Sequence, residues 1–435
     1  MLEFSYEVVV IGGGPAGFAA AVASARQGAK TTLIERYGFC GGMATAGGVS
    51  VYMNEHAGTR NLASNIYNEL IDGMIKDGAA YASTEIAKSV VANTEDIKKA
   101  CDDMLVESGV DIYYHLTLEG AAFNNGTIES ITATGRSNKK YKFASKVFID
   151  ATGDADLAFF AGLETEVGRP QDNQCQPMTQ IYSVGPVDLE KARAGGCEVV
   201  DNKYVWWGDG DPNLLKYIKM AKDNNEWKIP KECFCLIWAD PRCPWMVTVN
   251  GTRMVGYDAT NSLEVTKAEL EGRKQVADAV EFMRKYLPGF ENVQLVKTSP
   301  QLGVRETRRV IGPYRLVEDD VVECRKFDDQ IAKVAYYIDA HSPDSEGTDM
   351  RRLPEGECYG IPYRCLQSKD CRNYLVAGRA ISASHIAASS ARVMPVCMTT
   401  GEAAGVAAAM AARNESCVAD VDIVKLKEII EVDSK

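Results

Sequence analysis

Three glycines near the start of the chain form the clearest chemical pattern in this sequence. Gly12, Gly14 and Gly17 make a Gly-x-Gly-x-x-Gly motif, with an apolar run before it and an alanine-rich segment after it. Such glycines allow a tight turn, a close approach of the backbone to a pyrophosphate, and close packing of a helix on a strand. Glu35 ends a second apolar run, where it can accept hydrogen bonds from a ribose. The pattern predicts a dinucleotide site.

The segment after Gly14 is expected to be a helix that points at this ligand. Pro15 and Ala16 stand where its first turn begins, and proline is well suited to that position. The N–H groups and dipole of the first turn attract phosphate. We therefore include Pro15 and Ala16 among the cofactor-binding residues.

A cluster of charged residues in the second half of the chain has two interpretations. It contains Arg305, Glu306, Arg308 and Arg309. These arginines could anchor a carboxylate or another anionic substrate by bidentate pairing. They could equally form an internal Arg–Glu lattice that braces the nucleotide domain. The same two interpretations apply to Arg392, which could hold a substrate or only cap a structural element.

The cysteines do not predict a metal site. The chain has 13 of them, scattered along its length. Their spacings match neither the paired Cys-x-x-Cys of zinc sites nor the ordered spacing of ferredoxin-type clusters. We expect reduced, mostly buried thiols and no bound metal.

Three separate strand ends are expected to face the same ligand. An apolar strand precedes Gly12, another precedes Gly153, and a short one precedes Gly378. In an open parallel sheet, ligands bind at the carboxyl ends of the strands, so the three turns could share one crevice. A mononucleotide would not need so many turns, whereas a long dinucleotide such as FAD would.

These features predict an α/β fold with a Rossmann-like FAD-binding domain assembled from both ends of the chain. We expect its N-terminal part over residues 1–165 and its C-terminal part over 351–435. A mainly β (α+β) substrate-covering domain would be inserted over 166–350, which holds all five tryptophans. Those aromatic residues could form its core, a subunit interface or a surface on which a substrate stacks. In the C-terminal part, glycines at 401 and 405 inside a small-residue helix suggest close approach of another backbone or a ligand.

Composition limits the partners. The chain has 435 residues, 46% of them hydrophobic, and a formal net charge of −12. This charge disfavours nucleic acid and anionic membrane surfaces. Neither a leader nor a membrane-spanning run is recognisable. We expect a cytoplasmic protein with a small-molecule substrate, and a homo-oligomer is compatible with the sequence.

Several segments resemble those of FAD-dependent oxidoreductases. Residues 35–48 are similar to the flavin-contacting loop of the glutathione-reductase-like superfamily, and residues 151–154 to its second FAD motif. Further segments resemble one family of bacterial FAD-dependent oxidoreductases: Gln176-Pro177-Met178-Thr179, residues 303–309, 359–364 and 377–385, and 392–405. The resemblance covers nearly the whole chain. It bears on FAD binding more than on any particular substrate.

The resemblance implies a set of cofactor contacts. Glu35 would bind the adenosine ribose and Arg36 would lie near the adenine, while Asp154 would secure the middle of FAD. The helix after Pro395 would point its N-terminus at the flavin. The third turn commonly has Gly-Asp in this superfamily but reads Gly378-Arg379 here, so Arg379 is a candidate for a phosphate contact. The loop expected along the pyrophosphate and flavin contains Gly41, Gly42, Met43, Ala44 and Thr45.

The resemblance also places two reactive side chains near the flavin. His385 follows the third turn and is a candidate general acid or base, although a lone histidine is often structural. Cys40 lies in the flavin loop and could be a redox thiol, a covalent attachment point or a packing residue; the absence of a partner cysteine nearby favours packing.

The predicted reaction is hydride transfer between a small organic substrate and N5 of FAD, with His385, Arg305 and Arg392 handling the substrate. A flavoprotein monooxygenase and a non-catalytic electron carrier or redox sensor are the alternatives.

Overall fold

The computed structural model describes residues 1–53, 55–83, 89–208, 210–234 and 236–434. Its main sheet runs in the order β8-β2-β1-β11-β10-β9, and β24 pairs with the second half of β11. The strands β8, β2, β1, β11 and β24 are parallel to their neighbours in this set, whereas β10 and β9 are antiparallel. The bounds are β1 Leu2–Ile11, β2 Thr31–Glu35, β8 Asp111–Tyr114, β9 Thr117–Asn124, β10 Thr127–Thr134, β11 Lys140–Asp150 and β24 Tyr374–Val376.

The register brings the three predicted turns together. Ile11 pairs with Asp150, and Asp150 pairs with Val376. The strands β1, β11 and β24 therefore end in one row, and the glycine turns that follow them lie at the same sheet edge. The prediction of a shared edge is confirmed. The central strand can be buried on both faces because residues 8–11 are all apolar.

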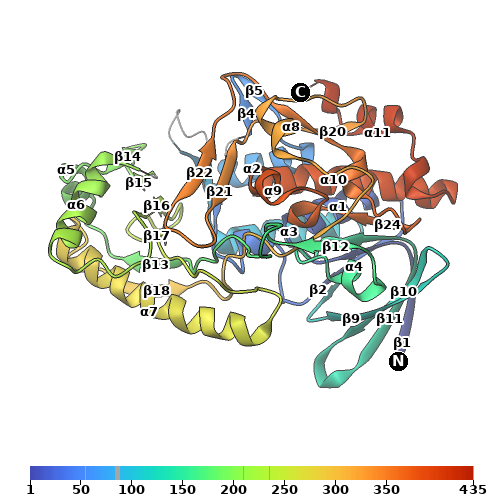
Figure 1. The fold of residues 1–435 in the computed structure, drawn as a ribbon, viewed down its shortest axis with the longest axis horizontal. Coiled ribbons are helices and arrows are strands. Elements are labelled where there is room, and N and C mark those ends of the chain that lie inside the picture. Colours follow the sequence, from blue (N-terminus) through green and yellow to red (C-terminus); the bar gives the residue numbers. More distant parts are fainter. Residues whose placement is uncertain (54, 84–88, 209, 235, 435) are drawn as a thin grey trace.

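Helices α1 and α10 lie against each other beside this sheet (Figure 1). A Cβ on Gly401 would come 2.1 Å from the Ala16 carbonyl oxygen, and one on Gly405 would come 2.2 Å from that of Ala20. The glycines inside α10 therefore allow close approach of the α1 backbone, which was one of the two predicted reasons for them. The helices are α1 Pro15–Arg26, α2 Asn65–Lys76, α3 Thr94–Glu107, α4 Asp156–Ala161, α5 Leu189–Ala194, α6 Pro212–Asp223, α7 Ser262–Tyr286, α8 Glu318–Val322, α9 His385–Ala391, α10 Met394–Asn414 and α11 Ile423–Ile429.

A second sheet, in the order β14-β15-β16-β17-β13-β18, lies to one side of the first together with the long helix α7 (Figure 1). It has its own hydrophobic core, which contains Trp206, Trp207 and Trp238. These tryptophans are mainly core residues, whereas Trp245 is exposed. The strands are β13 Tyr182–Gly185, β14 Glu198–Val200, β15 Tyr204–Trp207, β16 Leu236–Ala239, β17 Val247–Asn250 and β18 Gln294–Thr298.

The packing differs from the domain boundary expected at residue 350. The second core reaches only to Val293 along the inserted segment. Residues 310–340 pack into the first core, because β20 pairs with β23 and β21 packs on α9. The smaller strands are β3 Val51–Tyr52, β4 His56–Ala57, β5 Arg60–Asn61, β6 Ala80–Ala82, β7 Val90–Ala92, β12 Thr165–Val167, β19 Arg308–Val310, β20 Gln330–Val334, β21 Ile338–His341, β22 Thr348–Arg351 and β23 Tyr359–Pro362.

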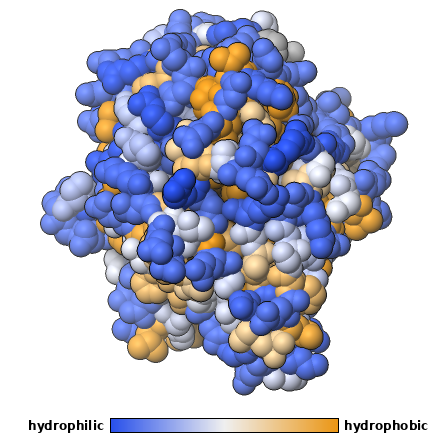
Figure 2. Space-filling model, turned by 90° about the vertical axis from the view of Figure 1, so that its right-hand side faces the viewer, coloured by the Kyte–Doolittle hydropathy of each residue, from blue (hydrophilic) through white to orange (hydrophobic). Residues whose placement is uncertain are grey.

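The surface agrees with the charged composition. Figure 2 shows a face on which hydrophilic side chains predominate and hydrophobic groups are scattered among them. Within the described residues, no single helix has the length and apolar character needed to cross a membrane; the bent pair α9 and α10 would meet those criteria only jointly.

Candidate functional site

A cavity of about 1060 Å³ extends from the sheet edge to the inserted sheet. One end is formed by the glycine turns, and the other includes Ile181, Trp206, Trp238 and Asn250 from the inserted segment. Its volume lies at the upper end of the range for ligand pockets, which leaves room for more than one small molecule. The predicted residues that line it are Gly12, Gly14, Pro15, Ala16, Glu35, Arg36, Gly42, Met43, Arg305, Gly378, Arg379 and Arg392.

The first turn has the geometry of a phosphate cradle. Gly12 has φ +96°, and a Cβ there would lie 2.5 Å from the Ala151 carbonyl oxygen. A Cβ on Gly17 would lie 1.7 Å from the Gly12 oxygen, so only glycine lets α1 approach β1 this closely. At Gly14, by contrast, no described atom lies within 4 Å of the Cβ position. Gly14 therefore presents bare backbone to the cavity.

The acidic residue at the end of β2 is held beside this turn. The Glu35 carboxylate accepts hydrogen bonds from the backbone N–H of Gly13 at 2.6 Å and of Tyr37 at 2.7 Å. Burial raises the pKa of Glu35, although both hydrogen bonds oppose that rise. Next to it, Arg36 donates to Gln301 and lies over the Tyr37 ring. Both Glu35 and Arg36 line the cavity, as their predicted contacts with adenosine require.

The second and third turns are joined by an ion pair. Arg379 donates from Nη2 to Oδ1 of Asp154 at 2.5 Å, and from Nε to the Gly153 carbonyl at 2.7 Å. Thr307 also donates to Asp154. Burial would raise the pKa of Asp154, but Arg379 and Thr307 outweigh it and hold that pKa below its usual value. Arg379 lines the cavity while Asp154 lies behind it, so Asp154 acts on the cavity wall through Arg379.

The N-terminus of α10 opens on the same cavity. Its N-cap Val393 and first residue Met394 line the wall, together with Cys397 one turn further. No side chain caps this helix end among the described residues. Its partial positive charge is therefore available to an anionic group in the cavity. Pro395 lies in the first turn of α10 and is buried outside the lining.

The remaining predicted loop residues support the cradle from behind. Gly41 has φ +103°, which favours glycine, and Thr45 donates from its hydroxyl to the Cys40 carbonyl at 2.8 Å. Ala44 is fully buried. Gly41, Ala44 and Thr45, like Gly17, stand outside the cavity lining that the described residues form. In this structure they shape the turn behind the lining.

The structure favours packing for Cys40. Its side chain is fully buried, and a Cβ on Gly13 would lie 2.7 Å from its sulfur. Tyr114 donates to the thiol at 3.5 Å. Burial raises the pKa of Cys40 well above its usual value, which opposes thiolate formation. Among the described residues, the cysteine that lines the cavity is instead Cys397. Its thiol donates to the Arg392 carbonyl at 3.1 Å, and burial raises its pKa to about 12.

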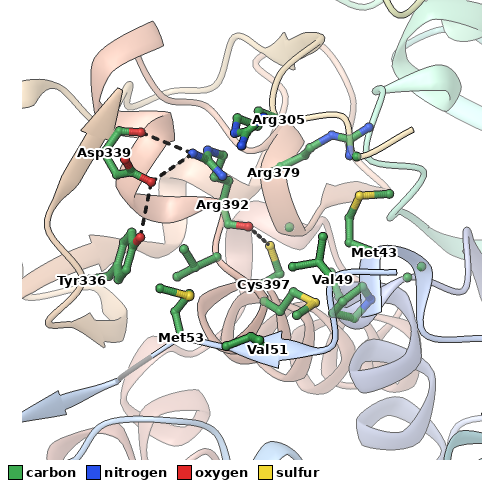
Figure 3. A pocket seen from close by; sticks show the side chains of 18 of the residues that line it. Met43, Val49, Val51, Met53, Arg305, Tyr336, Asp339, Arg379, Arg392 and Cys397 are labelled. Carbon is green, nitrogen blue, oxygen red and sulfur yellow. Dashed lines mark hydrogen bonds and ion pairs between the residues drawn. The ribbon is translucent and has the colours of Figure 1, made fainter. Parts of the chain in front are cut away.

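Several charged side chains line the part of the cavity that lies beyond the N-terminus of α10 (Figure 3). Arg305 donates to the Pro177 carbonyl at 2.7 Å and to the Thr179 hydroxyl at 2.5 Å. Arg392 contacts the Asp339 carboxylate at 3.5 Å, and Tyr336 donates to the same carboxylate at 3.3 Å. The two predicted substrate arginines thus lie in the wall of one cavity.

Sequence reasoning missed Asp339 and His341 in this group. The His341 ring lies 3.0 Å from the Thr348 hydroxyl through Nδ1 and 3.5 Å from Asp339 through Nε2. Burial and the charge of Arg305 lower the pKa of His341 to about 3, so the ring is neutral at pH 7. Burial would raise the pKa of Asp339, but His341, Arg392 and Arg305 hold it below its usual value. No motif surrounds these residues; the scarcity of histidine was the only signal.

Among the described residues, His385 does not line the cavity, although its position in the sequence after the third turn suggested that it would lie near the flavin. Its Nδ1 lies 2.9 Å from Glu306 Oε1, and Glu306 forms a buried ion pair with Arg309. Arg309 also contacts Glu166. Within the described residues, His385 is buried outside the cavity lining. This arrangement supports the alternative of an internal Arg–Glu lattice for this part of the cluster.

Comparison with known proteins identifies the family. The family model described as FAD dependent oxidoreductase matches residues 7–430, so the chain belongs to this family. The cofactor of this family is FAD, and the cavity lining fits it. Gly14 offers open backbone, Glu35 offers a carboxylate, and the N-terminus of α10 also opens on the cavity. Bound FAD supplies an acceptor or donor of two electrons.

Two curated relatives match in part. A cinnamate reductase from Clostridium sporogenes is 35% identical over 116 residues, which are 26% of this chain and 16% of that protein. A leghemoglobin reductase from Glycine max is 34% identical over 91 residues, 21% of this chain and 16% of that protein. The matched segments thus span about a sixth of each relative.

Solved structures resemble the chain over most of its length at low identity. A geranylgeranyl bacteriochlorophyll reductase-like protein from Thermoplasma acidophilum is 15% identical, with a TM-score of 0.48, and the match covers 99% of this chain and 84% of that one. A p-nitrophenol 4-monooxygenase from Pseudomonas putida is 12% identical, with a TM-score of 0.48 and coverage of 99% and 84%.

Proposed function

We propose that this protein transfers a hydride between a small organic substrate and N5 of its FAD. The observation that carries the proposal is the continuity of the cavity. One space joins the glycine cradle of β1 and α1 to a chamber bounded by Arg305, Arg392 and the inserted sheet. A protein that only stored or relayed electrons would have no need for such a chamber beside its cofactor.

The chamber has groups suited to positioning a substrate and moving its proton. When an alcohol or amine is oxidised, two electrons and a hydrogen leave the carbon as hydride, and a proton leaves the heteroatom. Asp339 and neutral His341 are the titratable pair in the wall beside Arg392. We assign the proton transfer to this pair. We assign to His385 a positioning role through Glu306.

The proposal is tested by mixing the anaerobic holoenzyme with small alcohols, amines, hydroxy acids and unsaturated acids. Oxidised enzyme should lose its flavin absorbance with a substrate of the right class, and chemically reduced enzyme should regain it with the corresponding product. Flavin that responds to dithionite or partner proteins, but to no small molecule, would contradict hydride transfer. Oxygen incorporation coupled to NADPH consumption would instead favour the monooxygenase alternative.

The assignment of the proton-transfer residue needs a matched pair of variants. Loss of a general acid or base typically slows the chemical step by about 10²- to 10⁴-fold. We expect that loss for His341→Gln and little change for His385→Gln, with both proteins retaining flavin. The opposite result would return the catalytic role to His385.

A further inference from the structure

The two arginines of the chamber reach it from different elements. Arg305 lies in the segment before β19, and Arg392 is the C-cap residue of α9 at the bend into α10. Figure 3 shows both guanidinium groups on one side of the cavity and Val51 and Met53 on the other. The wall with the two guanidinium groups also contains the Asp339 carboxylate, so it carries two positive charges and one negative charge opposite an apolar wall.

Arg392 makes a looser ion pair than two other arginines of the protein, Arg315 and Arg379. Arg315 bonds Glu166 at 2.8 Å and Arg379 bonds Asp154 at 2.5 Å, whereas Arg392 lies 3.5 Å from Asp339. Charge-assisted pairs between guanidinium and carboxylate are strongest at about 2.7–2.9 Å. The Nε of Arg392 also has no hydrogen-bond partner among the described residues. Its donors are therefore incompletely used.

The charge of Arg305 reaches His341 and Asp339 in the same wall. It contributes to lowering the pKa of both His341 and Asp339, so it lies within electrostatic reach of both side chains. The two guanidinium charges outnumber the single Asp339 carboxylate in this wall, so together they would stabilise an anion bound beside the arginines. A carboxylate matches the planar fork of a guanidinium group, and an apolar body attached to it would meet Val51 and Met53.

We propose that the chamber binds a small organic monocarboxylate, with its carboxylate at Arg305 and Arg392 and its apolar body toward Val51 and Met53. This assignment of the substrate class rests on the proposed function. It concerns the substrate's binding group and leaves open which carbon of the acid reacts.

The test uses benzoate, a carboxylate that a flavin does not oxidise, titrated into the holoenzyme. Benzoate should perturb the bound flavin's absorbance, and benzamide, its neutral counterpart, should bind at least tenfold more weakly. Arg305→Gln and Arg392→Gln should each raise the Kd for benzoate about tenfold, or about 1.4 kcal/mol. Arg364→Gln is the matched control, because Arg364 pairs with Asp329 outside the cavity lining; it should leave the Kd unchanged.

Two further measurements separate a structural effect from a loss of binding. Flavin content reports whether each variant keeps its fold, and Arg305→Lys and Arg392→Lys supply milder changes that keep the charge. Equal binding of benzamide and benzoate would overturn the proposal. So would wild-type affinity for benzoate in both glutamine variants, or arginine-dependent binding of inorganic phosphate that is as tight as that of benzoate.

Turnover distinguishes this proposal from the proposed function. Reduction of the flavin by organic acids but not by their amides supports both. Reduction by neutral alcohols or amines alone overturns the carboxylate assignment and leaves hydride transfer standing. Arginine-dependent binding of benzoate supports the carboxylate site. If, in addition, no compound of the panel reduces the oxidised flavin and none reoxidises the reduced flavin, hydride transfer is overturned.

Discussion

Arg379 and Asp154 form an ion pair at 2.5 Å between turns that are more than two hundred residues apart in the sequence. The superfamily that the chain resembles commonly has aspartate at the position of Arg379, and the sequence made Arg379 a candidate for a phosphate contact. Here the carboxylate comes from the turn after β11, and the arginine of the turn after β24 reaches across to it. A Cβ on Gly153 would lie 3.1 Å from the Arg379 guanidinium carbon, so this glycine gives the side chain its path.

Breaking this pair should destabilise the holoenzyme. Arg379→Met keeps the length of the side chain but leaves the Asp154 carboxylate without its guanidinium partner. We expect the free energy of unfolding to fall by about 3 kcal/mol in a urea titration. The exposed pair of Arg364 and Asp329 is the control, and Arg364→Met should cost no more than about 1 kcal/mol. Equal losses in the two variants would show that the Arg379 pair is no stronger than a surface pair.

Two glycines of the first turn should separate cofactor binding from folding. Gly14 has open space at its Cβ position, so Gly14→Val should leave the free energy of unfolding of the apoprotein nearly unchanged and abolish flavin binding. Gly17→Ala places a methyl group 1.7 Å from the Gly12 oxygen and should destabilise the protein itself. Flavin absorbance and urea unfolding measure the two effects. Purified Gly14→Val with a full complement of flavin would contradict the cradle assignment.

The fold of the nucleotide domain could be predicted because its signals are local. Each apolar strand runs directly into a glycine turn, and parallel pairing brings the ends of β1, β11 and β24 to one edge. The β9–β10 hairpin likewise has an Asn-Gly pair in its turn. The boundary near residue 350 could not be placed this way. It depends on β20 pairing with β23, a contact that no composition change marks.

The substrate side of the site was only partly predictable. Arg305 and Arg392 could be recognised as candidates because arginine clusters suggest anion binding. Asp339 and His341 owe their position to the packing of β21 on α9, and their chemistry to burial beside Arg305. His385 lies nearer a recognisable motif, yet its ring bonds Glu306. A residue that is close in sequence to a cofactor motif can have its side chain either in the cavity or in the protein interior behind the cavity lining.

The contact between α1 and α10 should tolerate no added methyl group. Gly401→Ala would bring a Cβ 2.1 Å from the Ala16 carbonyl oxygen, backbone that cannot move without shifting α1. We expect a loss of about 1–3 kcal/mol in the free energy of unfolding, and weaker flavin binding because α1 also carries the cradle. Gly73 is the matched control inside α2, since no described atom lies within 4 Å of its Cβ position. Gly73→Ala should stabilise the protein by up to about 1 kcal/mol. A stabilised Gly401→Ala would contradict the close packing.

The burial of His341 should appear in the pH dependence of stability. Its pKa is lowered from 6.5 to about 3 in the folded protein. Between these values the unfolded chain binds a proton at this position that the native state does not bind. The free energy of unfolding therefore falls as the pH falls below 6.5, by at most about 1.4 kcal/mol per pH unit.

Comparison with His341→Gln isolates this effect from the other histidines. Between pH 7 and pH 5, the wild type should lose about 2 kcal/mol more stability than the variant in urea titrations. The charged groups facing His341 are Asp339, Arg305 and Arg392. Both arginines keep their charge between pH 7 and pH 5, and the pKa of Asp339 is held below its ordinary 3.8. None of these three groups therefore contributes to the difference in stability between the two proteins over this range. Parallel curves for the two proteins would mean that His341 titrates normally and is not enclosed in the wall beside Arg305.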